Sequence, residues 1–329
     1  MTANWLRRIV MLAVCASAAL LAGCGSSVES SLKPTRIITF GDAFNDVGNT
    51  ASGNKYTVND GSINNWTQQV AADYGGVTIT PSNSGGLGYA QGNARITLTP
   101  DAAGSTATKT VTQQIDAFLA SHSFQPNDLV IINGGISDIV VQWEAMAAGS
   151  QTAAQMNANI TQAANDLGVQ VRRLVNAGAQ HVMVVGPYDL SVSPWATTLG
   201  QGQTPGQGHQ STALSNTTVL FNDTLLLNIA GLGANVLYVD AAFYFNLVAF
   251  SPASYAPLVT GTAAACTSVD AGPGIGIGAG QVNSSLCTPS TIASGVNYTT
   301  YLFADPLYFA PSAQRLFGDN AYSKITRRF

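Results

Sequence analysis

The stretch DLVIINGGISD, which runs from Asp128 to Asp138, decides the fold. Its first six residues form a continuous run rich in Val and Ile, which is typical of a strand buried on both faces. The same kind of run recurs at three other places: Arg36–Phe40 (RIITF), His181–Val185 (HVMVV) and Asn235–Val239 (NVLYV). Strands buried on both faces belong to parallel sheets, whose faces are covered by helices.

Amphipathic patterns fill the segments between these runs. The clearest covers Ala153–Ala177, where apolar residues recur at three- or four-residue spacing: Ile160, Ala164, Leu167, Val171 and Leu174. Further helices are predicted over residues 66–74, 111–120, 214–229 and 312–325. The alternation of strands and helices predicts an α/β fold, a three-layer α/β/α sandwich with a central parallel sheet. Such sheets place their functional sites at the carboxyl ends of the strands.

Charge is scarce along the chain. Of its 329 residues, 46% are hydrophobic and 9% are charged, against about 25% charged in an average soluble protein. A chain this apolar can bury a large core, which excludes disorder driven by charge. The 13 Lys and Arg against 17 Asp and Glu give a net charge of −4, and no basic run exceeds two residues. Nucleic acid is therefore excluded as a partner.

Residues 1–23 have the layout of a secretory signal: two arginines, an apolar run, and small residues before Cys24. The apolar run of about 13 residues is too short to cross a bilayer. The end of this segment, Leu-Ala-Gly-Cys, resembles the lipobox of bacterial lipoproteins, which implies cleavage before Cys24 and lipidation of that cysteine. Gly25 is similar to the residue found there in lipoproteins sorted to the outer membrane. The alternative is an ordinary secretory signal with an incidental cysteine.

Lipidation would anchor the protein stably to a membrane of the bacterial envelope. Loss of the two signal arginines leaves a net charge of 11 − 17 = −6. Residues 24–35 are polar and predict a tether. Residues 36–329 contain no linker or change in composition and predict a single domain, within which residues 251–296 read as an inserted loop region.

Cys266 and Cys287 stand 21 positions apart in this insertion. In an exported chain, two such cysteines predict a disulfide. Closing a loop of this size contributes on the order of 3 kcal/mol in the chain-entropy model. Two free thiols and a metal site are the alternatives, the latter disfavoured because neither cysteine has a His or second Cys at ligand spacing.

Four motifs follow the predicted strands or stand near the C-terminus: FGDAFNDVG (Phe40–Gly48), GGLGYAQGNAR (Gly85–Arg95), GGISD (Gly134–Asp138) and FADPLYFAP (Phe303–Pro311). Together they resemble the four blocks of the SGNH/GDSL lipase and esterase family. GAQHVMVVGPYDL (Gly178–Leu190) is similar to the family's stretch between its third and fifth blocks. The resemblance covers residues 36–326 and implies a flavodoxin-like α/β fold.

The resemblance implies ester hydrolysis by a Ser nucleophile and a His base, oriented by an Asp. In this sequence Ala43 stands at the nucleophile position and Tyr308 at the base position, whereas Asp305 is retained. A methyl group cannot attack a carbonyl, and a phenol with an ordinary pKa of about 10 is a poor general base at neutral pH. These two replacements predict loss of the family's mechanism.

The resemblance also implies an oxyanion hole made of a backbone N–H, a Gly and an Asn. Ser137 replaces that Asn, and its hydroxyl can donate although it reaches less far. Asn93 stands where related sequences have a glycine, but if the donor is Gly92 this member of the hole is kept. Asn is one of the few residues that tolerate a positive φ. A pocket with several donors is therefore expected to persist.

Another base could have replaced the lost histidine. His122 is expected in a solvated loop and His181 at the end of a buried strand. His209 follows the loop after the HVMVV strand and could approach the strand ends, with Ser137, Ser191 or Ser193 as the nucleophile. This rearranged site stays an alternative.

Other motif residues have structural interpretations. Asp42 and Asp305, kept without their partners, are expected to cap a turn or a helix N-terminus. GPGIGIGAG at 272–280 lacks the Lys-Ser/Thr of a phosphate-binding loop, so a flexible loop is expected and no cofactor or metal is predicted. One group of aromatic side chains either lines an acyl or glycan pocket or forms ordinary core: Trp66, Tyr298, Tyr301, Phe303, Tyr308 and Phe309.

The sequence therefore predicts a lipid-anchored envelope protein, most simply an outer-membrane lipoprotein, that has lost ester hydrolysis. It would bind an acyl-bearing ligand, a glycan or a partner protein through the former active-site cleft. An active ester hydrolase with a rearranged site and a structural or adhesive surface lipoprotein stay open. An open cleft between Ala43, Asn93, Ser137 and Tyr308 would favour ligand binding, whereas a cleft filled by Tyr308 and Phe44 would favour the structural role.

Overall fold

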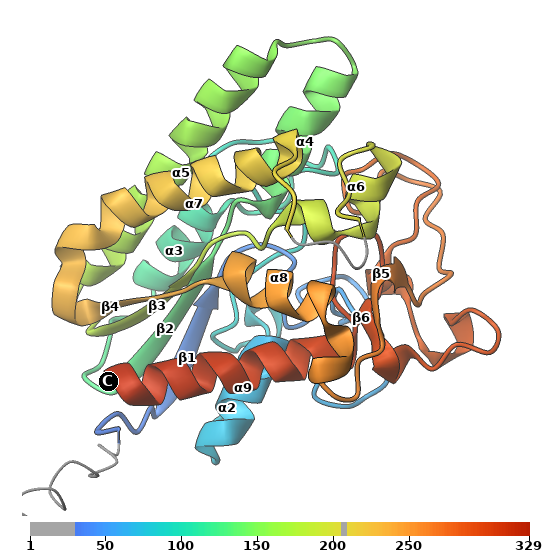
Figure 1. Cartoon of the computed structure of the whole chain (residues 1–329). Coiled ribbons are helices and arrows are strands. Elements are labelled where there is room, and N and C mark those ends of the chain that lie inside the picture. Colours follow the sequence, from blue (N-terminus) through green and yellow to red (C-terminus); the bar gives the residue numbers. More distant parts are fainter. Residues whose placement is uncertain (1–29, 205–208) are drawn as a thin grey trace, which may run out of the picture.

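A parallel sheet forms the centre of the molecule. The structure is a computed structural model that describes residues 30–204 and 209–329. Four strands are hydrogen-bonded in the order β1-β2-β3-β4, all parallel (Figure 1): β1 (Arg36–Phe40), β2 (Asp128–Asn133), β3 (His181–Val185) and β4 (Val236–Val239). The α/β class and the parallel sheet predicted from the sequence are confirmed, and only β4 starts one residue later than expected.

On the other side of β1 the sheet continues only as an isolated parallel bridge between Thr39 and Gly88. The backbone N–H of Thr39 donates to the carbonyl of Leu87 at 3.0 Å, and the N–H of Tyr89 donates to the carbonyl of Thr39 at 2.7 Å. Both groups of Thr39 are therefore used on the side away from β2. The GGLGY motif lies at this edge because of these bonds.

Helices follow the strands as the periodicity predicts. Five predicted helices occur within three residues of their expected ends: α2 (Trp66–Tyr74), α3 (Val111–Leu119), α5 (Ala153–Asn176), α7 (Ala213–Ile229) and α9 (Pro311–Arg328). Helix α5 starts at a capping box in which the Thr152 hydroxyl accepts from the N–H of Gln155. Helices α5 and α7 pack on each other, and so do α2 and α9.

Three helices were not predicted: α4 (Ile136–Ala147), α6 (Pro194–Thr198) and α8 (Ala241–Phe250). Helix α6 is only five residues long, too short to show a period. Helix α8 reads AAFYFNLVAF and is apolar nearly all round, so it shows no amphipathic period either. Helix α4 begins inside the GGISD motif, directly after two glycines, and glycines are typical of loops rather than of helix starts.

Aromatic side chains fill the core near the carboxyl ends of the strands. The rings of Phe245 and Phe309 stack with centroids 3.8 Å apart, and Phe44 packs on Trp66 and Phe317 at 5.5 Å each. Most of the aromatic group named above is thus ordinary core. Its exceptions, Tyr298 and Tyr301, are half-buried beside the disulfide.

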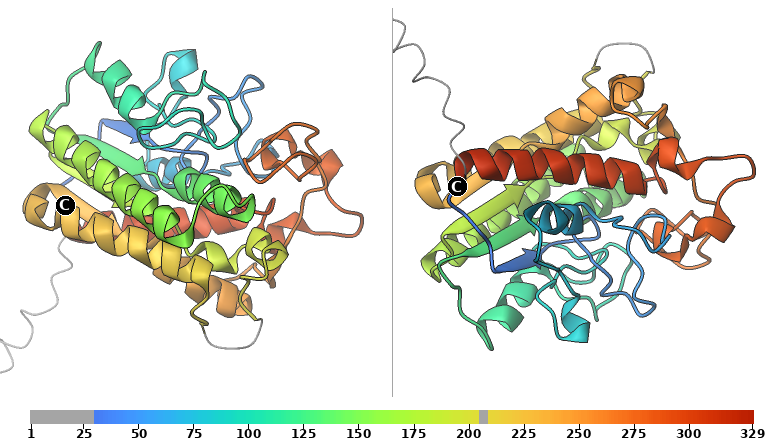
Figure 2. Two further views of the ribbon diagram at one scale, coloured as in Figure 1. Left: turned by 90° about the horizontal axis from the view of Figure 1, so that it is seen from above. Right: turned by 90° about the horizontal axis from the view of Figure 1, so that it is seen from below.

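The inserted region contains the predicted disulfide between Cys266 and Cys287, whose Cα atoms lie 6.0 Å apart. It also contributes β5 (Thr260–Ala264), which pairs in parallel with β6 (Tyr301–Phe303). Figure 2 shows this region, in orange and red, extending beyond the sheet on the side away from the C-terminus. The insertion is therefore more ordered than the loop region expected from its composition.

The first described residues and the last ones lie side by side. The hydroxyl of Ser31 donates to the carbonyl of Phe329 at 2.8 Å, at the end of the sheet where the strands begin. The predicted signal segment and Cys24 lie outside the described residues. Among the helices of residues 30–204 and 209–329, none is long and apolar enough to cross a membrane.

Candidate functional site

The turn after β1 is held by buried side-chain amides. Gln114 accepts from the Gly41 N–H at 2.8 Å and donates to its carbonyl at 2.9 Å. Gly41 has a φ of +145°, and a Cβ there would lie 1.7 Å from Oδ1 of Asn133, so only glycine fits. The turn carries Asp42 and Ala43. Ala43 is the first of the five positions that the resemblance assigns to catalytic or oxyanion-hole residues, called the family positions here: Ala43, Asn93, Ser137, Asp305 and Tyr308.

Asp42 has the structural role predicted for it. Its Oδ1 accepts from the N–H of Phe44 at 3.0 Å and from Nδ2 of Asn133 at 2.6 Å. Burial raises the pKa of Asp42 to about 6, although these hydrogen bonds oppose the shift. Ala43 beside it is buried, with 2% of its surface exposed.

Asp305 caps a turn, which was also predicted. Its Oδ1 accepts from the N–H groups of Leu307 and Tyr308, both at 2.7 Å, and its Oδ2 accepts from the N–H of Ser284 at 2.9 Å. Burial raises the pKa of Asp305 to about 6. Because both oxygens are occupied by backbone donors, this carboxyl group holds the chain rather than a catalytic base.

Tyr308, which the resemblance aligns with a histidine, is packed into the interior. Its side chain is 1% exposed, and its ring lies edge-on to that of Tyr56 with centroids 5.3 Å apart. Burial, together with the nearby carboxyl groups of Asp42 and Asp305, raises the pKa of Tyr308 well above its ordinary value. A phenol that holds its proton this tightly cannot serve as a general base at neutral pH.

Tyr56 occupies the region of the predicted oxyanion hole. A Cβ added to Gly92 would lie 1.9 Å from the Tyr56 hydroxyl oxygen, so the ring rests directly on the glycine. The Gly92 N–H donates to Oδ2 of Asp46 at 2.9 Å. The candidate hole donor is therefore used within the protein. Tyr56 carries no periodic or motif signal in the sequence, and its role was missed.

Asn93 has the positive φ anticipated for it, +62°. Its Nδ2 donates to the carbonyl of Gly274 at 2.8 Å, while its buried Oδ1 has no partner among the described residues. Gly274 belongs to the GPGIGIGAG segment. This segment is a loop, as expected, and its two isoleucines are buried, Ile275 at 1% and Ile277 at 8% exposed.

Ser137 lies in the first turn of α4, which follows Gly135 with a φ of +111°. Its Oγ is buried and makes no hydrogen bond within the described residues. The neighbouring Asp138 accepts from Nε of Arg95 at 3.2 Å and from the N–H of Ile96 at 3.1 Å. This buried ion pair fastens the GGISD motif to the end of the GGLGYAQGNAR motif.

The three histidines lie away from these family positions. His209 Nε2 lies 2.7 Å from Oδ2 of Asp189 and 3.1 Å from Oγ of Ser215, and that Oγ lies 3.1 Å from the same carboxylate oxygen. A catalytic histidine uses one ring nitrogen for the carboxylate and the other for the nucleophile, whereas a single nitrogen faces both groups here. The cluster does not have the geometry of a triad.

The predicted partners of His209 are engaged elsewhere. Ser191 Oγ donates to Oδ1 of Asp189 at 2.7 Å, and Ser193 Oγ donates to the carbonyl of Leu190 at 2.6 Å. The proposed pairing of His209 with Ser137, Ser191 or Ser193 is therefore wrong for this structure. As expected, His122 is exposed and His181 is half-buried at a strand end.

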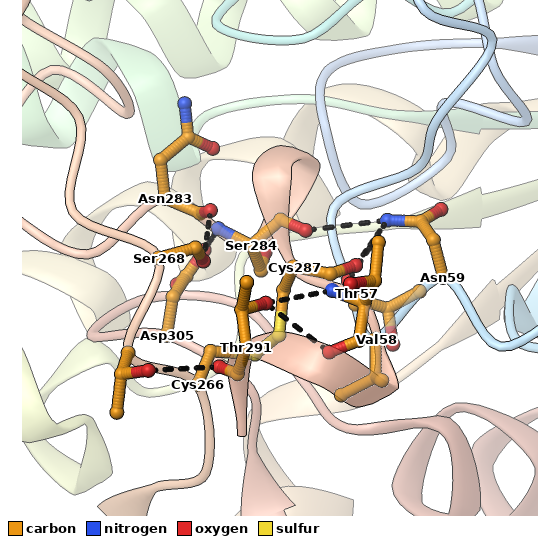
Figure 3. Close-up of a disulfide and its surroundings, with 12 residues drawn as sticks. Thr57, Val58, Asn59, Cys266, Ser268, Asn283, Ser284, Cys287, Thr291 and Asp305 are labelled. Atoms are coloured by element: carbon orange, nitrogen blue, oxygen red, sulfur yellow. Dashed lines mark hydrogen bonds between the residues drawn. A yellow bond between two sulfur atoms is a disulfide. The ribbon is translucent and has the colours of Figure 1, made fainter. Parts of the chain in front are cut away.

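Hydrogen bonds beside the disulfide join the insertion to the loop that carries Tyr56. Figure 3 shows Asn59 beside the disulfide, where its backbone N–H donates to the carbonyl of Cys287 at 2.9 Å. Its Nδ2 donates to the carbonyls of Ser284 and Cys287 at 3.3 and 3.1 Å. On the other side, the N–H of Cys266 donates to the carbonyl of Ala304 at 2.9 Å, next to Asp305. The insertion thus closes the carboxyl end of the sheet.

The arrangement combines buried polar groups at the strand ends with side chains that are closed off from solvent. Each of the five family positions, Ala43, Asn93, Ser137, Asp305 and Tyr308, is at most 6% exposed. No family model matches the chain, and no curated protein matches it either.

Proposed function

We propose that this protein is a lipid-anchored envelope protein of SGNH/GDSL-like fold that does not hydrolyse esters and binds a glycan or partner protein through its outer surface. The observation that carries the proposal is the packing at the family positions. Ala43 lacks a nucleophilic atom, Tyr308 is a buried neutral phenol, and Tyr56 rests on Gly92. The outer surface meant here is the disulfide-bearing insertion.

The family assignment draws support from topology as well as from the four motifs. If the bridge at Gly88 is counted as an edge strand, the sheet has the strand order 2-1-3-4-5, that of flavodoxin-like folds. In Figure 1 the α5–α7 pair lies above the sheet and the α2–α9 pair below it. This placement supports the finer description as a three-layer α/β/α sandwich.

The proposed loss of hydrolysis follows from the absence of a nucleophile and of a general base. Without an Oγ at position 43 no acyl-enzyme can form, and without a base at position 308 no proton can be removed from a nucleophile. Triad enzymes that lose a member keep some acceleration from their oxyanion hole. Here the Gly92 N–H is bonded to Asp46, so even that contribution is expected to be small.

Binding through the outer surface is favoured over binding in the cleft. An acyl group in the cleft would have to displace the rings of Tyr56 and Tyr308, which pack on each other. The insertion, in contrast, exposes apolar side chains to solvent: Val269 is 61% and Leu286 46% exposed. These side chains are accessible to a partner, whereas the family positions are not.

The envelope location rests on the lipobox-like sequence before Cys24. Mass spectrometry of the protein extracted from membranes should find a mature chain that starts at Cys24 and carries acyl chains. A Cys24→Ser variant should lack them. A mature chain cleaved elsewhere and free of lipid would leave the ordinary secretory signal as the correct interpretation.

An esterase assay tests the loss of catalysis. Purified protein should hydrolyse short-chain p-nitrophenyl esters no faster than a heat-denatured control. The rearranged site would instead give activity above that control, and His209→Ala would abolish it. A quadruple variant, Ala43→Ser with Asn93→Gly, Ser137→Asn and Tyr308→His, tests the motif assignment, because a folded variant of this kind should gain activity only if the motifs are aligned correctly.

A binding assay separates the outer surface from the cleft. Glycans such as peptidoglycan fragments, or a partner protein, should raise the melting temperature of the native chain, since a ligand that binds only the folded state stabilises it. The effect should disappear in a Val269→Asp/Leu286→Asp variant. An acylated ligand whose effect survives that variant but is lost in Tyr308→Trp would place binding in the cleft instead.

A further inference from the structure

The two edges of the sheet differ in how their backbone groups are covered. On the outer side of β1, the N–H and the carbonyl of Thr39 are both bonded to the GGLGYAQGNAR motif. The other edge strand is β4, whose backbone pairs with β3. Within residues 30–204 and 209–329, no backbone hydrogen bond joins the outer side of β4 to another segment. An edge strand with free N–H and C=O groups is a template for pairing with a further strand.

The sequence around β4 lacks the features that usually protect such an edge. The strand reads VLYV and contains neither a charged residue nor a proline. Its first three residues, 236–238, are half-buried, so they are accessible from outside. From residue 213 to residue 269 the chain has two charged residues, Asp223 before the strand and Asp240 directly after it.

Exposed apolar side chains flank this edge. In Figure 1, α7 lies above β4 and α8 continues from the end of β4. Twelve large apolar side chains of the described residues are exposed, and more than half of them lie on these two helices or on the loop after α8: Val219, Leu226, Leu227, Phe243, Leu247, Phe250 and Val259. The two most exposed are Leu227 at 80% and Phe243 at 64%. Apolar surface concentrated along one edge in this way is typical of an interface.

An open cavity of about 610 Å³ lies between α7 and β4. Leu226 and Leu227 line it on the helix, and Val236 and Tyr238 line it on the strand, together with Gly233 of the turn between them. The start of β4 thus has an apolar hollow beside it, whereas the end of β4 leads into the exposed ring of Phe243.

We propose that the β4 edge is the interface of a homodimer, in which β4 pairs antiparallel with β4 of a second copy about a two-fold axis. The two four-stranded sheets then form one continuous sheet. A two-fold interface uses the same patch on both copies, so a strand that pairs with its own copy must run antiparallel to it. In the symmetric register Val236 faces Val239 of the second copy, and Leu237 faces Tyr238 of the second copy.

Charged groups at the two ends of β4 are complementary in this arrangement. Arg328 lies at the start of the strand, where its Nη2 donates to the carbonyl of Gly233 at 2.5 Å. Asp240 follows the end of the strand and is exposed. Antiparallel pairing brings the start of each strand to the end of the other, so Arg328 faces Asp240 of the second copy, and symmetry repeats this pair. Opposite charges placed in this way fix the register of an interface.

Apolar groups are complementary in the same register. Gly233 lies opposite the first turn of α8 in the second copy, and that turn carries Phe243. The exposed ring of each copy is therefore placed beside the apolar hollow of the other. Burial of these rings and of the leucines that line the hollow supplies the apolar centre that a stable interface needs.

Asp223 opposes the association. It lines the cavity beside Val236 and Tyr238, near the middle of β4. Because the two-fold axis passes through the middle of the paired strands, the two Asp223 carboxyl groups approach each other. This repulsion distinguishes the proposed dimer from one formed through any other surface.

Sedimentation velocity tests the association. Residues 25–329 include every described residue and carry no lipid, so a dimer of this chain comes from the protein surface. The sedimentation coefficient should rise from the monomer value to the dimer value as the concentration is raised. Hydrogen exchange of the amides in residues 236–239 should slow over the same range, because their outer groups are bonded only in the dimer.

Two double variants with the same charge change locate the interface. Leu227→Asp/Phe243→Asp places charge on the β4 edge and should weaken the dimer on the order of 100-fold, since both side chains are central anchors. Val269→Asp/Leu286→Asp is the matched control, because it alters exposed apolar residues of the insertion. The control should dimerise like the unchanged chain. Both variants alter exposed positions and should keep its melting temperature.

Two single variants test the register. Asp223→Asn removes the repulsion near the axis and should tighten the dimer about two- to fivefold. Asp240→Asn removes the pair with Arg328 and should weaken the dimer by a similar factor, while asparagine still caps α8. Added salt should reduce both effects. Because the two variants change the net charge equally, their opposite signs report position rather than charge.

Four outcomes would overturn the proposal. They are a monomer at every concentration, a dimer that Leu227→Asp/Phe243→Asp leaves intact, and shifts of the same sign in Asp223→Asn and Asp240→Asn. The fourth is a monomer that floats with phosphatidylcholine vesicles and loses this binding in Leu227→Asp/Phe243→Asp, which would mean that a bilayer covers the edge. None of these measurements involves Cys24 or the family positions, so the dimer can fail without the proposed function and the reverse.

Discussion

The two ends of the sheet are built in opposite ways. The carboxyl end carries the family motifs and is closed by the insertion, so that its charged groups, Asp42, Asp46 and Asp305, are completely buried. The amino end carries most of the basic residues and leaves them exposed. Ligands of open α/β sheets usually bind at the carboxyl ends of the strands. In this molecule the carboxyl end has buried carboxyl groups, whereas most of the basic residues lie at the other end.

Hydrogen bonding at the carboxyl end is complete for two buried carboxyl groups and incomplete for other buried polar atoms. Both oxygens of Asp46 and both oxygens of Asp305 accept from backbone N–H groups. In contrast, Ser137 Oγ, Asn93 Oδ1 and Asp42 Oδ2 are buried without a partner in the described residues. An unsatisfied buried polar atom costs about 1–3 kcal/mol. Asp46 and Asp305 therefore hold the backbone with every carboxylate oxygen bonded, whereas Asp42, Asn93 and Ser137 each leave a buried polar atom unbonded at a cost in stability.

The largest expected change in stability comes from removing a buried side chain at the carboxyl end of the sheet. Tyr308→Ala should lower the free energy of unfolding by about 3–5 kcal/mol, because it removes a buried ring and leaves a cavity against Tyr56. Urea unfolding followed by circular dichroism measures this change. Tyr322→Ala is the matched variant at the amino end, where Tyr322 packs edge-on to Tyr74 but is half-buried.

The amino-end variant should lose clearly less stability than Tyr308→Ala, since its ring is partly in solvent already. Equal losses at the two ends, or a negligible loss from Tyr308→Ala, would mean that the carboxyl end is not closed by packing. Addition of a small aromatic compound should stabilise Tyr308→Ala alone if the cavity forms as expected.

The closure could not be predicted from the sequence, although the sheet could. Continuous apolar runs such as Asp128–Asn133 fix a strand within a few residues, because their pattern is local. Tyr56 reaches Gly92 and Tyr308 across long stretches of chain, and nothing in its neighbouring residues signals that contact. The disulfide was predictable because an exported chain with two spaced cysteines has few other uses for them. Its effect on the site, through Asn59 and Asp305, was not predictable because it depends on tertiary contacts.

Removal of the disulfide is the next largest change. Cys266→Ala/Cys287→Ala should lower the free energy of unfolding by on the order of 3 kcal/mol, the loop-closure contribution for this spacing. Hydrogen exchange should speed up at the loop that carries Asn59 and around Asp305, because both are bonded to the stapled insertion. Peptides from the amino end should be unchanged. Faster exchange spread evenly over both ends would show that the insertion is not a local closure.

The buried carboxyl groups predict a pH dependence. Burial raises the pKa of Asp42 to about 6 in the folded state, against about 3.9 when the chain is unfolded. The folded state therefore binds the proton more tightly, so the stability from this group is greatest below about pH 4 and is lost as the pH rises to about 6. Asp42→Asn mimics the neutral acid and should flatten this fall by on the order of 2 kcal/mol in urea unfolding.

Asp46→Asn is the control for that measurement. Asp46 also has a pKa raised to about 6 by burial, but its two oxygens accept from three N–H groups, those of Gly48, Asn49 and Gly92. An amide would turn one acceptor into a donor facing a donor, so this variant should be less stable at every pH. A fall with pH that persists unchanged in Asp42→Asn would mean that Asp42 is ionised in the folded state throughout the range.

The smallest effect is expected from an ion pair of the open end. Arg173 and Asp116 form a salt bridge, but their side chains are 36% and 53% exposed. Exposed pairs contribute about 0–1 kcal/mol and are weakened by salt. A double-mutant cycle of Arg173→Ala and Asp116→Ala should give a coupling energy in that range that falls as salt is added. A larger coupling that is insensitive to salt would mean that the amino end is less open to water than its exposed fractions indicate, and the contrast with the buried Arg95–Asp138 pair would then lose its basis.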